Sequence, residues 1–316
     1  MILKAALTVS VALSGSFAQA QLCSSWAAPK TIGHIDTTVI PEASGLAISS
    51  HFSERLYHVN DRGNVPVVFV SNFAGKIQQK ITVPGLKAGA DTESMGYGPC
   101  ESASKTCIFV GDIGDNDRAR ATIDLAWFEE KETFDGPAKL IGHISMKYPQ
   151  GANNAEGFFV HPNGDVFIFT KELKKASKKS GAEDEEGPST VYRLKASDVA
   201  KAKGTFTLEK VGVIDVPALI GNASKESKVV TGASASSDGR ILLLTYGAAL
   251  EILFTPGQML KSTKSMKQGS DYNIIKLDLP HQEAIEFLPD SSGFIVTSEK
   301  KKKSPEAPIV EVKCRS

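Results

Sequence analysis

The sequence predicts an all-β protein folded as a β-propeller. Short runs rich in Val, Ile, Phe and Thr recur along the chain, bounded by Gly, Pro, Asn and Asp, a pattern typical of strands and turns. Helical patterns of ten or more residues are scarce, and one strand–turn–strand motif returns five times. The clearest expected strands are Leu56–Asn60, Val65–Val70, Cys107–Val110, Asp165–Thr170, Arg240–Thr245 and Gly293–Thr297.

The repeated motif begins with an acidic or hydroxyl residue followed by a small one. It continues through an apolar strand, a turn and a second apolar strand, and then ends in a polar pair. The copies begin at Ser44, Glu93, Glu156, Thr231 and Glu283, so they recur at intervals of about 50 to 75 residues. Such intervals suit propeller blades of four strands each. We therefore predict five four-stranded blades, or six if a degenerate blade lies between residues 156 and 231.

Segments between the copies supply the outer strands of the blades. Lys76–Val83, Thr190–Leu194 and Phe206–Val216 have strand-like composition, whereas Ala196–Lys203 could form one or two helical turns. Lys174–Gly187 is charged and contains Gly and Ser, which indicates an exposed loop.

The chain ends are expected to close the ring. After the fifth copy only Ile309–Lys313 remains as a strand, so Thr31–Val39 would supply the missing outer strand and remove the open sheet edges. This closure brings Cys23 towards Cys314, while Cys100 and Cys107 bracket a short polar stretch that suits a hairpin. Four cysteines permit three connectivities, and we expect these two bridges.

The N-terminus has the features of a signal peptide. Lys4 is followed by the apolar stretch Ala5–Phe17 and by the small-x-small sequence Ala18–Ala20, which predicts cleavage before Gln21. The apolar stretch is shorter than the roughly 20 residues that span a bilayer. We expect residues 1–20 to be removed and residues 21–316 to form one domain in the periplasm or medium, where disulfides persist.

Composition restricts the function classes. The 316 residues contain 36 Lys plus Arg and 36 Asp plus Glu, and this balance argues against a nucleic-acid-binding protein. With 41% hydrophobic and 23% charged residues, the chain is ordinary for a globular protein, and no later segment could span a membrane. We expect a monomer whose partner is a small molecule or protein bound at the propeller rim.

The motif starts place acidic side chains around one axis, because the innermost strands of a propeller line its central channel. Carboxylates 4 Å apart near a surface repel by about 4 kcal/mol per pair, so they must be protonated, paired with cations or bound to a metal. Oxygen ligands suit calcium best. The candidate ligands are Glu42, Asp91, Glu93, Glu156 and Glu283; the second-strand ends add Asp61, Asp112, Glu172 and Glu299. The alternative is that these acids cap loops or pair with Lys171, Arg62 or Lys300.

Other polar positions are less specific. Gly111–Asn116 could bind a hard cation or simply form a tight loop held by Asx turns. His281 precedes Glu283 by two residues at the rim, and Tyr246 ends the fourth motif where other copies end in an acid. We expect Asp112, His281 or Tyr246 to handle protons or to orient a substrate if the protein is an enzyme.

Six short motifs, taken in order, resemble secreted bacterial β-propeller proteins distantly similar to gluconolactonase-like and phytase/esterase-like propellers. The motifs are Glu42-Ala-Ser-Gly-Leu, His58-Val-Asn-Asp, Asp91-Thr-Glu, Gly111-Asp-Ile-Gly-Asp-Asn, Ala155-Glu-Gly and Gln282-Glu-Ala. The resemblance covers nearly the whole mature chain and implies a propeller with a calcium site in its channel. In hydrolytic members the metal activates water or polarises the substrate. Thr231 and Tyr246 depart from a symmetrical acidic ring.

Two function classes therefore stay open. The first is a calcium-dependent hydrolase of a small phosphoester, ester or lactone, with Glu42, Glu93, Glu156 and Glu283 around the metal. The second is a non-catalytic propeller that binds a ligand or a protein, with any metal purely structural. Propellers host many unrelated functions, so only the geometry and chemistry of the site can distinguish these two classes.

Overall fold

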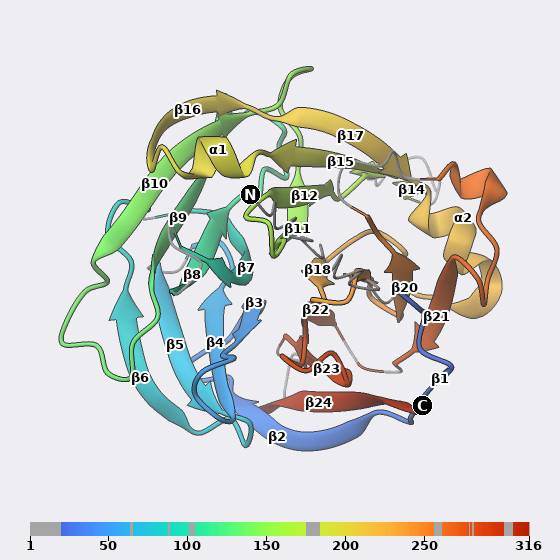
Figure 1. The fold of residues 1–316 in the computed structure, drawn as a ribbon, viewed down its shortest axis with the longest axis horizontal. Coiled ribbons are helices and arrows are strands. Elements are labelled where there is room, and N and C mark those ends of the chain that lie inside the picture. The colour runs from blue at the N-terminus through green and yellow to red at the C-terminus, as the bar shows by residue number, and fades with distance from the viewer. Residues whose placement is uncertain are drawn as a thin grey trace, which may run out of the picture.

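Five antiparallel sheets surround a central axis in the computed structural model, and each sheet is one blade (Figure 1). The structure describes residues 20–63, 66–87, 89–100, 105–174, 184–255, 261–277, 279, 281–299 and 306–315. The predicted signal segment, apart from Ala20, and Lys300 lie outside these ranges. The prediction of an all-β propeller with five blades is confirmed.

The blades follow one another along the chain. Blade 1 contains β3 (Ala43–Ile48), β4 (Arg55–Asn60), β5 (Val67–Asn72) and β6 (Ile77–Thr82); blade 2 contains β7 (Thr92–Pro99), β8 (Thr106–Asp112), β9 (Ile123–Glu129) and β10 (Leu140–Lys147). Blade 3 contains β11 (Ala155–Val160), β12 (Val166–Thr170), β15 (Ser189–Leu194) and β17 (Glu209–Ile214). Blade 4 contains β18 (Gly232–Ala235), β19 (Arg240–Leu244), β20 (Ala248–Leu253) and β21 (Tyr272–Lys276).

Blade 5 joins the two chain ends. Its strands are β22 (Gln282–Phe287), β23 (Gly293–Ser298), β24 (Glu306–Arg315) and the N-terminal strand β2 (Lys30–Asp36), with β1 (Ser25–Trp26) also paired to β24. The predicted closure of the ring is thus confirmed. Both predicted disulfides, Cys23–Cys314 and Cys100–Cys107, are present.

The long interval between the third and fourth motifs holds no sixth blade among its described residues. It contains the short strands β13 (Leu173–Lys174) and β14 (Glu185–Glu186), helix α1 (Ala196–Val199), strand β16 (Lys203–Thr207), helix α2 (Val216–Ile220) and the 3₁₀ turn η1 (Gly221–Ala223). A second 3₁₀ turn, η2 (Thr263–Ser265), precedes β21.

Two local predictions are corrected. The run Phe206–Val216 does not form one strand, because Leu208 lies buried between β16 and β17 and β16 pairs in parallel with β10 of blade 2. The segment Lys174–Gly187 is not wholly a loop, because its described ends pair as β13 and β14.

The hydrophobic core lies between the blades. Each of five clusters joins one blade to the next around the ring, for example Tyr57 and Val68 of blade 1 with Phe128 of blade 2. Alternation of apolar residues on both faces of each sheet produces these interfaces. No helix among the described residues is long and apolar enough to cross a membrane.

A β-bulge begins the innermost strand in four of the blades. The bulged residues are Ser44, Glu93, Glu156 and Glu283, each one extra residue opposite the partner strand. A bulge re-aims a side chain and tightens the local twist. These bulges are the physical basis of the repeated motif.

The small residue after the bulge is required by crowding at the axis. A Cβ on Gly45 would lie 2.8 Å from the backbone of Ser94 and Met95, and one on Gly157 would lie 3.0 Å from the backbone carbon of Gly232. The innermost strands of neighbouring blades therefore pack backbone against backbone.

Candidate functional site

Acidic side chains gather at one mouth of the central channel, where the innermost strands begin. Glu93, Glu156 and Glu283 are each buried, as is Asp91 two residues before Glu93. Asp61 follows β4, and Glu299 follows β23; both are half-buried. The structure thus brings together most of the acids that the motif predicted to converge.

Three of these acids form a compact group. One carboxylate oxygen from each of Asp61, Asp91 and Glu93 lies within 4.8 Å of the other two. Oδ1 of Asp91 is buried and accepts no hydrogen bond from any described residue. The nearest cation to that oxygen is the Nε of Arg62, at 3.9 Å, on a side chain that is mostly exposed. We call Asp61, Asp91 and Glu93 the acidic triad.

Gly114 packs directly against the acidic triad. A Cβ on this residue would lie 2.5 Å from Cγ of Asp91 and 2.7 Å from Oε1 of Glu93. The loop after β8 therefore closes over two of the three carboxylates only because residue 114 lacks a side chain. This loop is fixed by the backbone N–H of Gly114, which donates to the carbonyl oxygen of Asp91 at 3.1 Å.

Burial and repulsion from neighbouring acids raise the pKa values of Asp91 and Glu93. Burial, followed by repulsion from the neighbouring Asp61, raises the pKa of Asp91 to about 6. Burial, followed by repulsion from Glu156, raises the pKa of Glu93 well above its usual range, although Ser44 donates to Oε2 at 2.9 Å. The energetic cost of removing these protons is what a bound cation would offset.

A second polar group faces the acidic triad across the mouth. Nζ of Lys171 donates to both carboxylate oxygens of Glu156 and, at 2.9 Å, to the hydroxyl oxygen of Tyr246. Tyr246 in turn hydrogen-bonds Glu283. Lys171 is buried, so this group contains a desolvated cation between two glutamates and a phenol. We call Lys171, Glu156, Tyr246 and Glu283 the lysine network.

The lysine network also has shifted proton affinities. The pKa of Glu156 is raised to about 7 by burial, against which Lys171 acts in the opposite direction. Burial and repulsion from Glu156 raise the pKa of Glu283 well above its usual range. Glu299, beside this group, has a pKa of about 7 because of burial and repulsion from Asp61 and Glu42.

The remaining predicted site residues have different surroundings. Glu42 is exposed; its backbone N–H donates to Oδ1 of Asn60, and its carboxylate acts electrostatically on Glu299. Glu172 pairs with Arg118 at 2.6 Å. The predicted calcium ligands Glu42, Asp91, Glu93, Glu156 and Glu283 therefore fall into different local groups rather than one symmetrical ring.

The three predicted proton-handling residues are also distinct. Both carboxylate oxygens of Asp112 accept from the guanidinium of Arg120, at 2.7 and 2.8 Å, and Oδ1 also accepts the N–H of Asp91. These contacts favour a structural role for Asp112. His281 is exposed at the rim, and its ring meets the Tyr246 ring edge-on with centroids 6.3 Å apart. Their roles in proton transfer remain predictions.

The loop Gly111–Asn116 is held by its own hydrogen bonds. Asp115 accepts the backbone N–H groups of Ala119 and Arg120, and its own N–H donates to Oδ1 of Asn154. The sequence offered a tight loop held by Asx turns as one alternative, in which an aspartate accepts the N–H two residues on. The carboxylate of Asp115 instead accepts N–H groups four and five residues on, so the loop is held by aspartate contacts of longer range. The loop supports the acidic triad through Gly114.

Three contributors to the site were not assigned their roles from the sequence. The sequence placed Asp61 at the end of a second strand and Lys171 among the cations that could neutralise the acids. It placed Gly114 within the loop Gly111–Asn116 without a role of its own. The signal that could have found Asp61 is its position directly after β4, which is equivalent to that of Lys171 after β12 and of Glu299 after β23.

Solved structures with the same kind of fold include three with sugar-related titles. The chain is similar to the soluble aldose sugar dehydrogenase of Escherichia coli in its apo-form, with 10% identity, a TM-score of 0.48, and coverage of 92% of this chain and 100% of that one. It is also similar to a protein titled glucose dehydrogenase, with 7% identity, a TM-score of 0.46, and coverage of 90% and 99%.

The third is a gluconolactonase of Xanthomonas campestris, with 8% identity, a TM-score of 0.42, and coverage of 86% of this chain and 72% of that one. These likenesses concern the fold alone. No family model and no curated protein sequence matches the chain.

Proposed function

We propose that the chain is an exported hydrolase that binds a calcium ion on the acidic triad and cleaves a small ester, lactone or phosphoester at the channel mouth. The observation that supports it best is the buried Oδ1 of Asp91, which has no hydrogen-bond partner among the described residues and lies beside two further carboxylates. A buried carboxylate oxygen that accepts no hydrogen bond is costly unless a cation compensates it, and Arg62, 3.9 Å away on a mostly exposed side chain, does so only weakly.

The residues present fit a calcium ion. All three members of the acidic triad offer carboxylate oxygens, which are the ligands that calcium prefers. Gly114 leaves a cradle beside two of them that a Cβ would fill. When bound, the ion would supply Lewis-acid chemistry, because a cation polarises a carbonyl or phosphoryl oxygen and lowers the pKa of nearby water.

The chain's own residues can handle the protons of hydrolysis. Glu299 has a pKa of about 7 and is half-buried at the mouth, so it is suited to take a proton from an attacking water near neutral pH. The Tyr246 hydroxyl, held between Lys171 and Glu283, is placed to give a proton to a leaving oxygen. Lys171 keeps Glu156 ionised in part and orients Tyr246.

The predicted signal peptide and the two disulfides support export of the protein. Disulfides persist in the periplasm and outside the cell but are rare in the cytosol. Intact-mass measurement of protein recovered from the periplasm or medium should give a chain that starts at Gln21. A product that retains Met1 in the cytoplasm would contradict this part of the proposal.

Thermal melts with calcium and with a chelator test the cation site. A ligand at 100 times its Kd stabilises the folded state by about 2.7 kcal/mol, so wild-type protein should melt several degrees higher with calcium. Asp91→Asn should abolish most of this shift, whereas Glu132→Gln, a change of the same charge at an exposed residue, should keep it. Equal melting temperatures with calcium and chelator would overturn the cation site.

Hydrolysis is then tested directly with small p-nitrophenyl esters, lactones and phosphoesters. Calcium-dependent turnover that Glu299→Gln lowers at least tenfold, with unchanged calcium binding, would support the catalytic assignment. Calcium binding without turnover of any class would favour the second candidate, a ligand-binding propeller. That candidate is supported by the lysine network, in which the protein itself already compensates Glu156.

A further inference from the structure

A pocket of about 910 Å³ opens beside the channel mouth, between blades 4 and 5. Tyr246 and His281 belong both to its wall and to the mouth, so the two spaces adjoin. The rest of the lining comes from the segment 223–227, Gly247, Lys276 and Leu279. A smaller pocket of about 470 Å³ borders the mouth on the other side, next to Asp91.

The walls of the larger pocket are held in place by close packing. A Cβ on Gly247 would lie 2.0 Å from Oγ of Ser224 and 3.0 Å from Cβ of Glu226, so only glycine allows the 223–227 segment to approach. His281 has a φ of 41°, in the left-handed region that a non-glycine residue rarely adopts. Its carbonyl oxygen accepts the N–H of Glu299 at 2.8 Å, which ties the strained residue to the mouth.

The two pockets differ in charge. The lining of the larger pocket contains Lys225, Lys276 and the imidazole of His281 against one carboxylate, Glu226. Neither lysine forms a salt bridge with a described residue. The smaller pocket has five aspartates for its three basic residues; its charged residues are Arg62, Lys87, Asp91, Asp112, Asp115, Asp117, Arg120 and Asp124. We call the larger one the basic pocket.

We propose that the basic pocket binds an anionic group, a carboxylate or a phosphate, of the molecule whose reactive bond lies at the channel mouth. Lys225 and Lys276 are exposed at this wall, and ammonium groups without an acidic partner in a concave surface attract anions. The substrate class is accordingly an ester or lactone that also carries an acidic group. The assignment of an acidic ester or lactone as substrate rests on the proposed hydrolase function. The binding of an anion by the pocket does not depend on that function.

The arrangement also resolves an electrostatic difficulty. The acidic triad, which belongs to blades 1 and 2, would repel an anionic molecule from its side of the mouth. An anion held on the blade 4 and 5 side, by Lys225 and Lys276, approaches from the side opposite the acidic triad. Tyr246 lies between the two regions, because its hydroxyl contacts the lysine network and its residue lines the basic pocket.

Titration calorimetry with inorganic phosphate and, separately, with malonate tests the pocket. Both titrations use the mature chain in chelator, so that failure of the calcium site cannot affect the result. Lys225→Gln with Lys276→Gln should weaken binding of the preferred anion at least fivefold. Lys30→Gln with Lys147→Gln makes the same change in net charge at exposed positions away from the pocket and should leave binding unchanged.

The outcomes separate the two proposals. Tighter binding of phosphate or of malonate identifies which acidic group the pocket prefers. Absence of binding by both probes, or equal weakening in both double variants, would overturn the basic pocket even if calcium raises the melting temperature. Pocket-dependent anion binding together with no calcium effect would keep the pocket and overturn the cation-dependent hydrolase.

Discussion

Gly114 lies where the loop after β8 crosses the carboxylates of Asp91 and Glu93. Its φ is not in the left-handed region, so an alanine would be tolerated by the backbone, and only the space for its Cβ is missing. In the proposed calcium site, the separation of the carboxylates of Asp91 and Glu93 would therefore depend on Gly114, which packs on them because it lacks a side chain.

Gly114→Ala should therefore weaken the effect of calcium at least tenfold while the fold persists. Overpacking of this kind costs about 1–3 kcal/mol, and the carboxylates must move to relieve it. The measurement is a calcium titration followed by thermal melts. Gly136→Ala is the matched control. Gly136 has a φ of 102° and open space around its Cβ position, so this variant should lose stability through backbone strain while the acidic triad stays unchanged. Equal calcium responses in the two variants would contradict this account.

The buried Glu286 predicts a pH dependence of stability that is independent of the proposed calcium site. This residue of β22 accepts a hydrogen bond from Ser234 at 2.9 Å, and burial raises its pKa to about 8. The folded chain therefore holds this proton up to about pH 8, whereas the unfolded chain releases it near the ordinary glutamate value. Folded protein binds more protons in between, so stability falls as pH rises across this window.

Glu286→Gln should remove that loss. Each pKa unit corresponds to about 1.4 kcal/mol, so from pH 5 to pH 8 the variant should gain about 1–3 kcal/mol relative to wild type. Urea unfolding at the two pH values measures the difference. Glu54→Gln, at an exposed residue, should run parallel to wild type. If Glu286→Gln changes the free energy of unfolding by the same amount at both pH values, the pKa of Glu286 is not raised in the folded protein.

At the scale of elements, the repeat could be predicted from the sequence because one local feature, a β-bulge followed by a small residue, recurs. Ser44, Glu93, Glu156 and Glu283 are bulged residues followed by small ones, and both features are visible in the amino-acid order. The position of β16 could not be predicted in this way. Its partner β10 is distant in sequence, and nothing within Lys203–Thr207 specifies a parallel pairing with a neighbouring blade.

The same reasoning applies to the site. That acids meet at the mouth follows from the repeat, but which of them pair with cations depends on side chains from second strands and loops. Lys171 reaches Glu156 from the end of β12, and Arg120 reaches Asp112 from a loop. Sequence spacing gives the ring of acids, whereas the division into the acidic triad and the lysine network requires three-dimensional packing.

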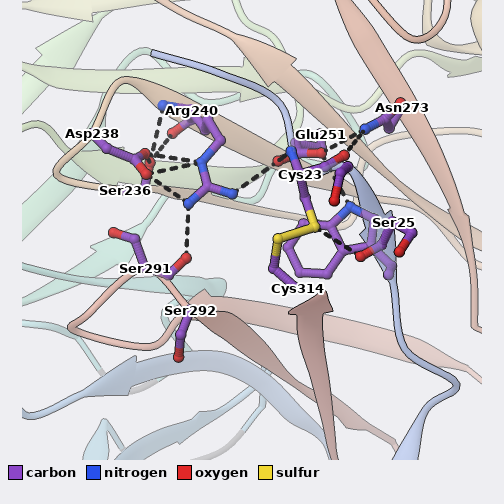
Figure 2. A network of polar contacts seen from close by, with 12 residues as sticks. Cys23, Ser25, Ser236, Asp238, Arg240, Glu251, Asn273, Ser291, Ser292 and Cys314 are labelled. Carbon is purple, nitrogen blue, oxygen red and sulfur yellow. Dashed lines mark hydrogen bonds and ion pairs between the residues drawn. A yellow bond between two sulfur atoms is a disulfide. The ribbon is translucent and has the colours of Figure 1, made fainter. Parts of the chain in front are cut away.

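Hydrogen bonds to the buried Glu251 hold the N-terminal segment against blade 4. Glu251 of β20 is fully buried and accepts hydrogen bonds from the N–H of Cys23 and the amide of Asn273 (Figure 2). It also accepts a hydrogen bond from the indole of Trp26. Arg240 of β19 pairs with the same carboxylate at 3.0 Å and also donates to the carbonyl oxygen of Ser291 in blade 5. One carboxylate thus connects blade 4, blade 5 and the beginning of the described chain.

Glu251→Gln should destabilise the protein by about 3–5 kcal/mol, because breaking a buried ion pair leaves the other charge incompletely compensated. Glu209→Gln breaks an exposed pair with Arg193 and should cost less than about 1 kcal/mol. Chemical denaturation of both variants tests this. Limited proteolysis should also cut the Glu251→Gln chain sooner near Cys23. Similar stabilities for the two variants would mean that Glu251 does not anchor the segment.

At the scale of the whole molecule, the ring is closed twice. β2 supplies the outer strand of blade 5 by pairing with β24, and the Cys23–Cys314 disulfide then joins the two ends covalently over a separation of 291 residues. The hydrogen-bonded closure removes the open edges of blade 5. The covalent closure acts mainly on the unfolded chain, whose conformational freedom it limits.

The two disulfides should therefore differ strongly in their contribution. In the chain-entropy account a bridge stabilises more as its loop lengthens, so the Cys23–Cys314 bridge should contribute about 5 kcal/mol and the Cys100–Cys107 bridge, with a separation of 7, about 2 kcal/mol. Denaturation of the Cys23→Ser/Cys314→Ser and Cys100→Ser/Cys107→Ser double variants measures both. Because the strand pairing survives, the first variant should still fold as a propeller with an unchanged far-ultraviolet spectrum. If the short bridge contributes as much as the long one, closure of the ring rests on strand pairing and the Glu251 network, and the terminal bridge adds little.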